Sequence, residues 1–329
     1  MPRLNSLTTI AITTGVFALA GIAWLLKSNQ ENQVQVQVRA QEQVPSGSTQ
    51  SSREKKPHRD LTSTRISESK WNALTRDDLP RHQRLELARQ ISDRLSPEDT
   101  ATLYAALKHT PPSANPEEWY VILNEIMEQM RRHGLGADEY SSRLGEIIAD
   151  TQQPEVVRDY AIQHLSGWIA PADPAQAPHE TDDDAIRQSL AHVTGAIADP
   201  AASQTSIPGT GLLMLANVSA RLPAEFTAPA WLSLEPFLTS ILSGDGAVSP
   251  STRISAVQAV GLAGQSQFLP AVRLLAADDA AEPSVRLSSI ASLGLYAAPE
   301  DRAFLQEIST GDSRYKFAAQ TALQRLGQD

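Results

Sequence analysis

The stretch Pro250-Ser251-Thr252-Arg253-Ile254-Ser255-Ala256-Val257-Gln258-Ala259-Val260-Gly261 decides the fold, because its pattern returns in Pro283-Ser284-Val285-Arg286-Leu287-Ser288-Ser289-Ile290-Ala291-Ser292-Leu293-Gly294. In both copies an arginine follows the proline by three residues, an apolar residue follows the arginine by seven, and glycine comes next. Each copy predicts a helix with proline in its first turn, apolar residues at helical spacing and a glycine near its end. The two arginines lie 286 − 253 = 33 residues apart, which predicts a repeat array rather than a single globular core.

Weaker copies extend the array in both directions. One runs from Lys316 to Leu323 without the proline, and another begins at Pro154 and includes Arg158. Between them we expect one or two irregular repeats, with a second helix around 211–218 that Pro208 introduces. Because a helical pair cannot bury its apolar stripe alone, neighbouring pairs should stack into a continuous core.

These Pro-x-x-Arg runs resemble the HEAT-repeat family, in particular its short bacterial versions. The resemblance is clear over 245–327 and weaker from 137 onward, and the spacing of 30 to 33 residues is shorter than the ~40–47 of longer HEAT units. The resemblance implies an all-α protein, a right-handed α-solenoid of HEAT-like helical pairs that binds other proteins. It carries no catalytic residues to transfer.

The N-terminal part has a different character. Leu7 to Leu26 are 20 residues without a charge, which at 1.5 Å per residue span about 30 Å, so residues 1–27 are predicted to be a transmembrane anchor. The alternative is a cleaved signal peptide, because Ala18-Leu19-Ala20 has the small-x-small form of a cleavage site. Residues 28–66 are rich in Gln and Ser and predict a disordered linker. The short N-terminus favours an inner-membrane, single-pass protein with its C-terminal domain in the periplasm.

Helical signals fill the rest of the chain. Ser96-Pro97-Glu98-Asp99 and Asn115-Pro116 are helix starts, with a cap residue followed by proline. We interpret 67–150 as N-terminal helical pairs that cap the array and 151–329 as the HEAT-like solenoid. Strand signals are almost absent from residue 67 onward, so the predicted class is all-α.

Composition and motifs narrow the function. A net charge of −10 argues against nucleic-acid binding, and the lack of cysteine excludes disulfides and thiolate sites. The acidic run 179–184 could hold a metal, but we favour a helix start capped by Thr181. His164 and the other histidines are scattered and match no catalytic spacing. We therefore expect no enzyme, no cofactor, no metal and no small-molecule substrate.

Two sets of residues are candidates for specific roles. Arg158, Arg253, Arg286 and Lys316 recur at one place in the unit, near Asp150, Asp279 and Asp312, and are expected to form ion pairs between repeats, with a functional cationic stripe as the alternative. Exposed positions of the second helices are the candidates for partner binding, namely Ser255, Gln258, Ser288, Ser292, Gln320 and Gln324.

The sequence thus favours a membrane-tethered scaffold or adaptor that binds proteins in a bacterial cell envelope. One alternative is a structural subunit of a larger envelope complex. Another is a lyase-type enzyme on a HEAT scaffold, since some short HEAT-like repeat proteins resemble bilin lyases.

Overall fold

The computed structural model describes residues 74, 79–91, 95–108, 115–134, 137–172, 182–311 and 314–327. The predicted anchor 1–27 and linker 28–66 lie outside these residues. Within the described part, the search for a helix both long and apolar enough to cross a bilayer finds none.

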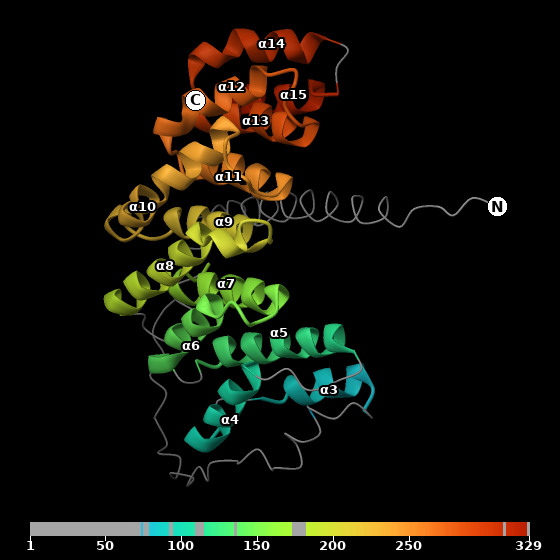
Figure 1. The fold of residues 1–329 in the computed structure, drawn as a ribbon, viewed down its shortest axis with the longest axis vertical. Helices are drawn as coiled ribbons and strands as arrows, with labels where there is room; N and C mark the ends of the chain where they lie inside the picture. The colour runs from blue at the N-terminus through green and yellow to red at the C-terminus, as the bar shows by residue number, and fades with distance from the viewer. Residues whose placement is uncertain are drawn as a thin grey trace, which may run out of the picture. The chain divides into compact units, whose positions relative to one another are not determined.

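The described residues are helical and contain no strand, as the sequence predicts (Figure 1). The helices are α3 (Arg81–Ala88), α4 (Pro97–Leu107), α5 (Pro116–Arg132), α6 (Ala137–Ala149), α7 (Glu155–Ile169), α8 (Asp183–Ala198), α9 (Ile207–Ser219), α10 (Ala224–Ser243), α11 (Pro250–Leu262), α12 (Leu269–Ala277), α13 (Pro283–Tyr296), α14 (Arg302–Thr310) and α15 (Lys316–Leu326). Short 3-10 turns precede α9, α12 and α14, at Pro200–Ala202, Ser266–Phe268 and Pro299–Asp301.

Helix starts follow the capping signals in the sequence. Ser96 and Asp99 form a capping box at α4, in which each side chain accepts a hydrogen bond from the other's backbone N–H. The Ser249 hydroxyl accepts from the Thr252 N–H at the start of α11, with Pro250 in the first turn. These caps satisfy N–H groups that the first helical turn cannot pair.

The helices form two rows. The second helices of successive pairs pack on one another in the series α5, α7, α9, α11, α13 and α15, while the first helices follow the series α6, α8, α10 and α12. Within the pairs, α6 packs on α7, α8 on α9, α12 on α13 and α14 on α15 (Figure 1). The stretch between α7 and α11 therefore holds one complete pair, α8 and α9, and the first helix of the next, α10.

One apolar core runs through these layers. Buried residues from Leu74 to Leu326 form a single contiguous cluster, and Tyr140 and Trp168 stack within it with ring centroids 4.4 Å apart. The expected division at 150 falls between α6 and α7, which pack against each other, so it marks no gap in the core. Stacking of pairs thus buries surface that no single pair could bury.

The glycine of the repeated pattern lies near the end of its helix, as expected. Gly261 lies one residue before the end of α11 and Gly294 two residues before the end of α13. The turns after these helices use Gly264 and Ala297, both in the left-handed region with φ of 62° and 52°. Gly294 also allows α15 to approach closely, because a Cβ at this position would stand 2.5 Å from the Ala322 Cα.

Candidate functional site

A surface groove lies between α10 and α12, in the row of first helices. Its α10 wall is the stripe Glu235, Thr239 and Ser243, which recur every four residues along one helix face. The same three residues also line an adjoining shallow pocket, to which α10 adds Leu232, Pro236 and Ser240.

The opposite wall is the matching stripe of α12 and the turn before it. Gln267, Ala271, Leu274 and Asp278 recur every three or four residues there. The space between the two stripes is about 530 Å³. The groove is thus bounded by side chains of two helices along its length.

The groove exists because the two helices differ in length. The 20 residues of α10 extend about 30 Å, whereas the nine residues of α12 extend about 14 Å. Leu234, Leu238 and Ile241 bind α10 to the core through its opposite face. A short partner cannot cover all of the remaining face.

Two leucines stand exposed in this part of the surface. Leu274, in the groove, is 73% exposed, and Leu232, in the adjoining pocket, is 70% exposed. Full burial of one leucine is worth about 1.5–3 kcal/mol, so the pair offers substantial free energy to a ligand that covers both. Single exposed leucines are ordinary on protein surfaces, but two in adjoining pockets suggest a binding surface.

The groove carries negative charge. Glu235, Asp245 and Asp278 are among the residues that line it and the adjoining pocket, and no lysine or arginine is, in the described part of the chain.

The arginines of the neighbouring helices are engaged elsewhere. Arg273 Nε donates to Asp301 Oδ1 at 2.7 Å, Arg253 bonds to the Gly246 carbonyl, and Arg286 pairs with Asp279. Asp278 Oδ1 accepts from the Ala280 N–H and Asp245 Oδ2 from the Ser243 hydroxyl, but among the described contacts Glu235, Asp245 and Asp278 form no ion pair. Their negative charge is therefore available to a positively charged ligand.

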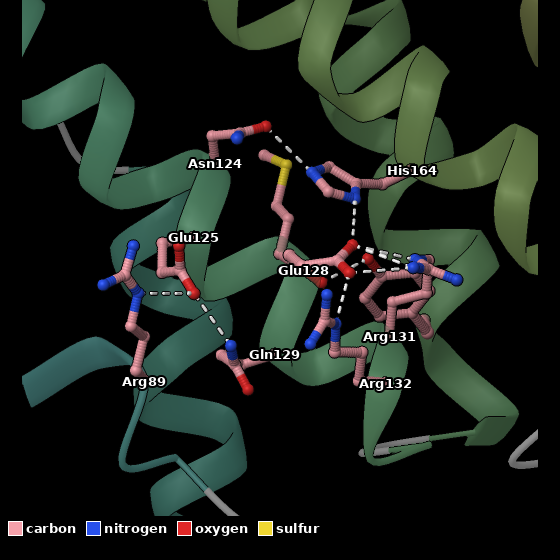
Figure 2. A network of polar contacts seen from close by, with 10 residues as sticks. Arg89, Asn124, Glu125, Glu128, Gln129, Arg131, Arg132 and His164 are labelled. Carbon is pink, nitrogen blue, oxygen red and sulfur yellow. Dashed lines mark hydrogen bonds and ion pairs between the residues drawn. The ribbon is translucent and has the colours of Figure 1, made fainter. Parts of the chain in front are cut away.

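A buried polar network between α5 and α7 is the second candidate (Figure 2). The Glu128 carboxylate accepts hydrogen bonds from Arg131 at 2.9 Å and from Arg132 at 2.5 Å. His164 reaches it from α7, with Nδ1 3.5 Å from Glu128 Oε2 and Nε2 2.9 Å from Asn124 Oδ1. Figure 2 shows the imidazole held between Asn124 and Glu128.

Burial sets the protonation of this network. Desolvation lowers the pKa of His164 to about 4 even though the Glu128 carboxylate opposes the shift, so the imidazole is neutral at pH 7. Burial alone would raise the pKa of Glu128, but hydrogen bonds from Arg132 and Arg131 hold it below its usual range. The network thus joins α5 and α7 through an ionised Glu128 carboxylate, paired with two arginines, beside a neutral His164.

The predicted partner-binding residues divide into two groups. Gln324 is exposed, and Ser255, Gln258 and Gln320 are half-buried. The exposure expected of Ser288 and Ser292 is wrong, since they are only 6% and 2% exposed. Small side chains at these positions let neighbouring helices approach closely, so the contacts between repeats cover them.

The recurring basic residues bond mainly to backbone rather than to neighbouring repeats. Arg158 Nε donates to the Ile148 carbonyl at 2.9 Å, and Arg286 Nε donates to the Ala276 carbonyl at 3.0 Å. Both carbonyls lie at the C-terminal end of the preceding helix, where backbone acceptors lack helical partners.

Ion pairing is found at one of the four positions. Among the described contacts, an ion pair is present for Arg286 but not for Arg158, Arg253 or Lys316. Its partner, Asp279, lies in the turn before the same helix, so this pair does not join two repeats. Asp312 lies outside the described residues.

The acidic run before α8 is partly outside the described residues, at 179–181. The cap of α8 is Asp182, whose carboxylate accepts from the Asp184 N–H at 2.7 Å, rather than the expected Thr181. Among the residues described, no group of three or more His, Asp or Glu is arranged to hold a metal ion.

The sequence reasoning missed the α10–α12 groove. A weak signal exists, because Leu232 shares a helical stripe with Glu235, Thr239 and Ser243 rather than with the buried Leu234 and Leu238. That stripe identifies an exposed leucine, but only the packed structure shows that α12, with the exposed Leu274, lies beside it.

Comparison with known proteins adds little to this description. No family model matches the chain, and no curated protein matches it. A solved structure that matches is that of human deoxyhypusine hydroxylase in complex with glycerol, at 15% identity, covering 80% of this chain and 96% of that chain with a TM-score of 0.30.

This match corrects the expectation that the chain is not an enzyme. That expectation rested on the lack of short catalytic motifs, yet the matching structure is that of a hydroxylase. At this TM-score the likeness transfers no activity, substrate or residue role.

Proposed function

We propose that this chain is a membrane-tethered scaffold of HEAT-like helical pairs, wound as a right-handed solenoid, that holds a protein partner in the α10–α12 groove. The observation that carries the proposal is the exposed Leu274 in the α10–α12 groove together with the exposed Leu232 in the pocket that adjoins it. A stacked array presents long, fixed surfaces of side chains and suits recognition of another protein.

The tether is supported by the sequence alone. The uncharged run from Leu7 to Leu26 has the length of a bilayer span, and the Gln- and Ser-rich residues after it form a linker. We place the solenoid in the bacterial periplasm, close to the inner membrane. Partners in or near that membrane then meet the groove at a raised effective concentration.

Site-specific crosslinking in cells tests the groove. A photoreactive phenylalanine analogue replaces Leu232 or Leu274 in the full-length protein, and a third variant carries it at Phe317 as control, since Phe317 is 79% exposed on α15. The proposal expects one shared adduct from both groove positions that is missing from the control. The same adducts at all three positions, or none in the groove, would contradict it.

Fractionation and protease treatment test the tether and the side of the membrane. The full-length protein with a C-terminal tag should sediment with membranes, and protease added to intact spheroplasts should digest the tag. A soluble protein would remove the tether from the proposal, and protection of the tag until lysis would move the solenoid to the cytoplasm. A partner that co-purifies at fixed stoichiometry would favour a structural subunit over an adaptor.

A further inference from the structure

We infer that the occupant of the α10–α12 groove is an amphipathic helix of a partner protein whose apolar stripe is flanked by lysine or arginine. The inference rests on the proposed function and names the class of partner. It is carried by three properties of the groove, namely its walls, its charge and its length.

The walls favour a helix over other peptide conformations. Both walls consist of side chains from α10 and α12, and a helix offers no free row of backbone N–H and C=O groups to which a strand could add. Proline-rich peptides bind grooves lined by exposed aromatic rings, but Phe268, the aromatic residue that lines this groove, is 4% exposed. An apolar channel between two helices suits the apolar face of a third.

The wall chemistry also argues against a small polar ligand. Such sites usually contain a few converging polar groups within a largely enclosed pocket. Most side chains that line this groove are exposed, and none of the buried polar atoms without a hydrogen-bond partner in the described residues belongs to it. The groove therefore fits a ligand that brings surface of its own.

The charge of the groove selects a basic partner. Glu235 and Asp278 lie on opposite walls, with Asp245 beyond the end of α10, so carboxylates flank the apolar channel. A helix with lysine or arginine beside its apolar stripe would place cations next to these groups. An acidic helix, a phosphate-bearing lipid or a nucleic acid would be repelled.

The length of the groove sets the size of the partner helix. The face of α10 that lines the groove and the adjoining pocket runs from Leu232 to Ser243, a rise of about 16 Å. That distance equals about three helical turns, so the partner should present apolar residues at i, i+4 and i+7. Leu232 and Leu274 would contact these residues.

Synthetic peptides provide the test. The probes are two fluorescein-labelled 14-residue amphipathic helices with the same leucine positions, one with lysine and one with glutamate at all other positions. Binding to the full-length protein in detergent is followed by fluorescence anisotropy. The lysine peptide should bind at least about tenfold more tightly than the glutamate peptide, and added salt should narrow the difference.

Matched variants locate the binding. Leu274→Asp should weaken the lysine peptide by about tenfold or more, whereas Phe317→Asp, at another exposed apolar position, should not. The double variant Glu235→Gln with Asp278→Asn should weaken it and reduce its salt dependence. Glu117→Gln with Glu307→Gln, which removes two exposed charges on α5 and α14, is the control for attraction by net charge.

Several results would overturn the inference. They are equal binding of the two peptides, equal losses from the groove and control variants, or a dimer that Leu274→Asp converts to a monomer, which would make a second copy the occupant. Unchanged thermal unfolding shows that a variant is folded, and the high exposure of Leu274 makes this the expected result. Groove adducts in cells together with equal peptide binding would leave the proposed function standing and reject only the basic helix.

Discussion

Arginine side chains close the ends of several helices in this array. Arg158 and Arg286 each donate to a carbonyl ten residues earlier, at the end of α6 and of α12, while Arg221 Nη1 donates to the Ala170 carbonyl after α7 at 2.8 Å. Arg302 Nη2 donates to the Leu326 carbonyl at the end of α15, also at 2.8 Å. The last carbonyls of a helix lack hydrogen-bond partners and carry the negative end of its dipole. A guanidinium there supplies both a hydrogen-bond donor and a positive charge.

This role predicts unequal effects at Arg286 and Asp279. Arg286→Met removes the bond to the Ala276 carbonyl and the contact of the guanidinium with the Tyr315 ring, 4.8 Å away, and should cost roughly 1–3 kcal/mol of unfolding free energy. Asp279→Asn removes only an ion pair to an exposed carboxylate and should cost at most about 1 kcal/mol. Urea unfolding of the two variants measures the difference. Equal losses would restore the ion pair as the main role of this position.

His164 predicts a dependence of stability on pH. Its folded pKa of about 4 lies below the ordinary 6.5, so the unfolded chain binds the proton more readily. The stabilisation is complete above about pH 6.5 and is lost as pH falls from there toward 4, by about 3 kcal/mol in total. Glu128, whose pKa is lowered, adds a further loss at still lower pH.

Unfolding curves at pH 7, 6, 5 and 4 check this expectation. His164→Gln should flatten the dependence between pH 6.5 and 4, whereas the control His133→Gln, at an exposed position after α5, should leave it unchanged. A variant at 164 that keeps the slope of the parent protein would show that other groups cause it.

At the scale of helices, glycine controls how closely the second helices approach. A Cβ at Gly294 would stand 2.5 Å from the Ala322 Cα, which is backbone and cannot turn aside. A Cβ at Gly261 would meet first the Leu295 Cδ1 at 3.0 Å, the end of a flexible side chain. A Cβ at Gly195 in α8 would meet nothing within 4 Å.

Three alanine substitutions therefore have a predicted order. Gly195→Ala should stabilise the protein by up to about 1 kcal/mol through helix propensity alone. Gly261→Ala should be near neutral, and Gly294→Ala should destabilise by roughly 1–3 kcal/mol because α13 and α15 must separate. Thermal unfolding measures all three. A stabilised Gly294→Ala variant would show that the two helices can move apart without loss.

These elements also show what the sequence could predict. Capping residues such as Ser96 and Ser249 mark helix starts, because the cap is a local interaction between neighbours in the chain. The burial of Ser288 and Ser292 could not be predicted, since it depends on which face the next repeat covers. The Ser288 hydroxyl is buried without a hydrogen-bond partner among the described residues, whereas the neighbouring Ser289 hydroxyl donates to the Val285 carbonyl of its own helix at 2.9 Å. The groove depends in the same way on the unequal lengths of α10 and α12.

At the scale of the whole molecule, the last pair of helices affects the charge of the groove. Arg273 belongs to α12, beside Leu274, but its guanidinium is held by Asp301 in the turn before α14. Asp301 is almost fully buried and Arg273 is partly exposed, so the buried carboxylate holds the guanidinium by two charge-assisted hydrogen bonds. The packing of α14 and α15 thus keeps one cation from neutralising the acidic groove.

Asp301→Asn tests this link between the last pair and the groove. Loss of the carboxylate removes both hydrogen bonds that hold the Arg273 guanidinium and leaves it only Glu300, 3.8 Å away. Its positive charge should then weaken the lysine peptide by roughly two- to fivefold through repulsion at a solvent-exposed site. Arg273→Gln added to Asp301→Asn should restore the affinity, because no free cation remains. Anisotropy titrations of both variants at low and moderate salt measure the effect, with thermal unfolding as the check on folding. If the double variant binds as weakly as Asp301→Asn alone, the loss comes from displacement of α12 rather than from the charge of Arg273.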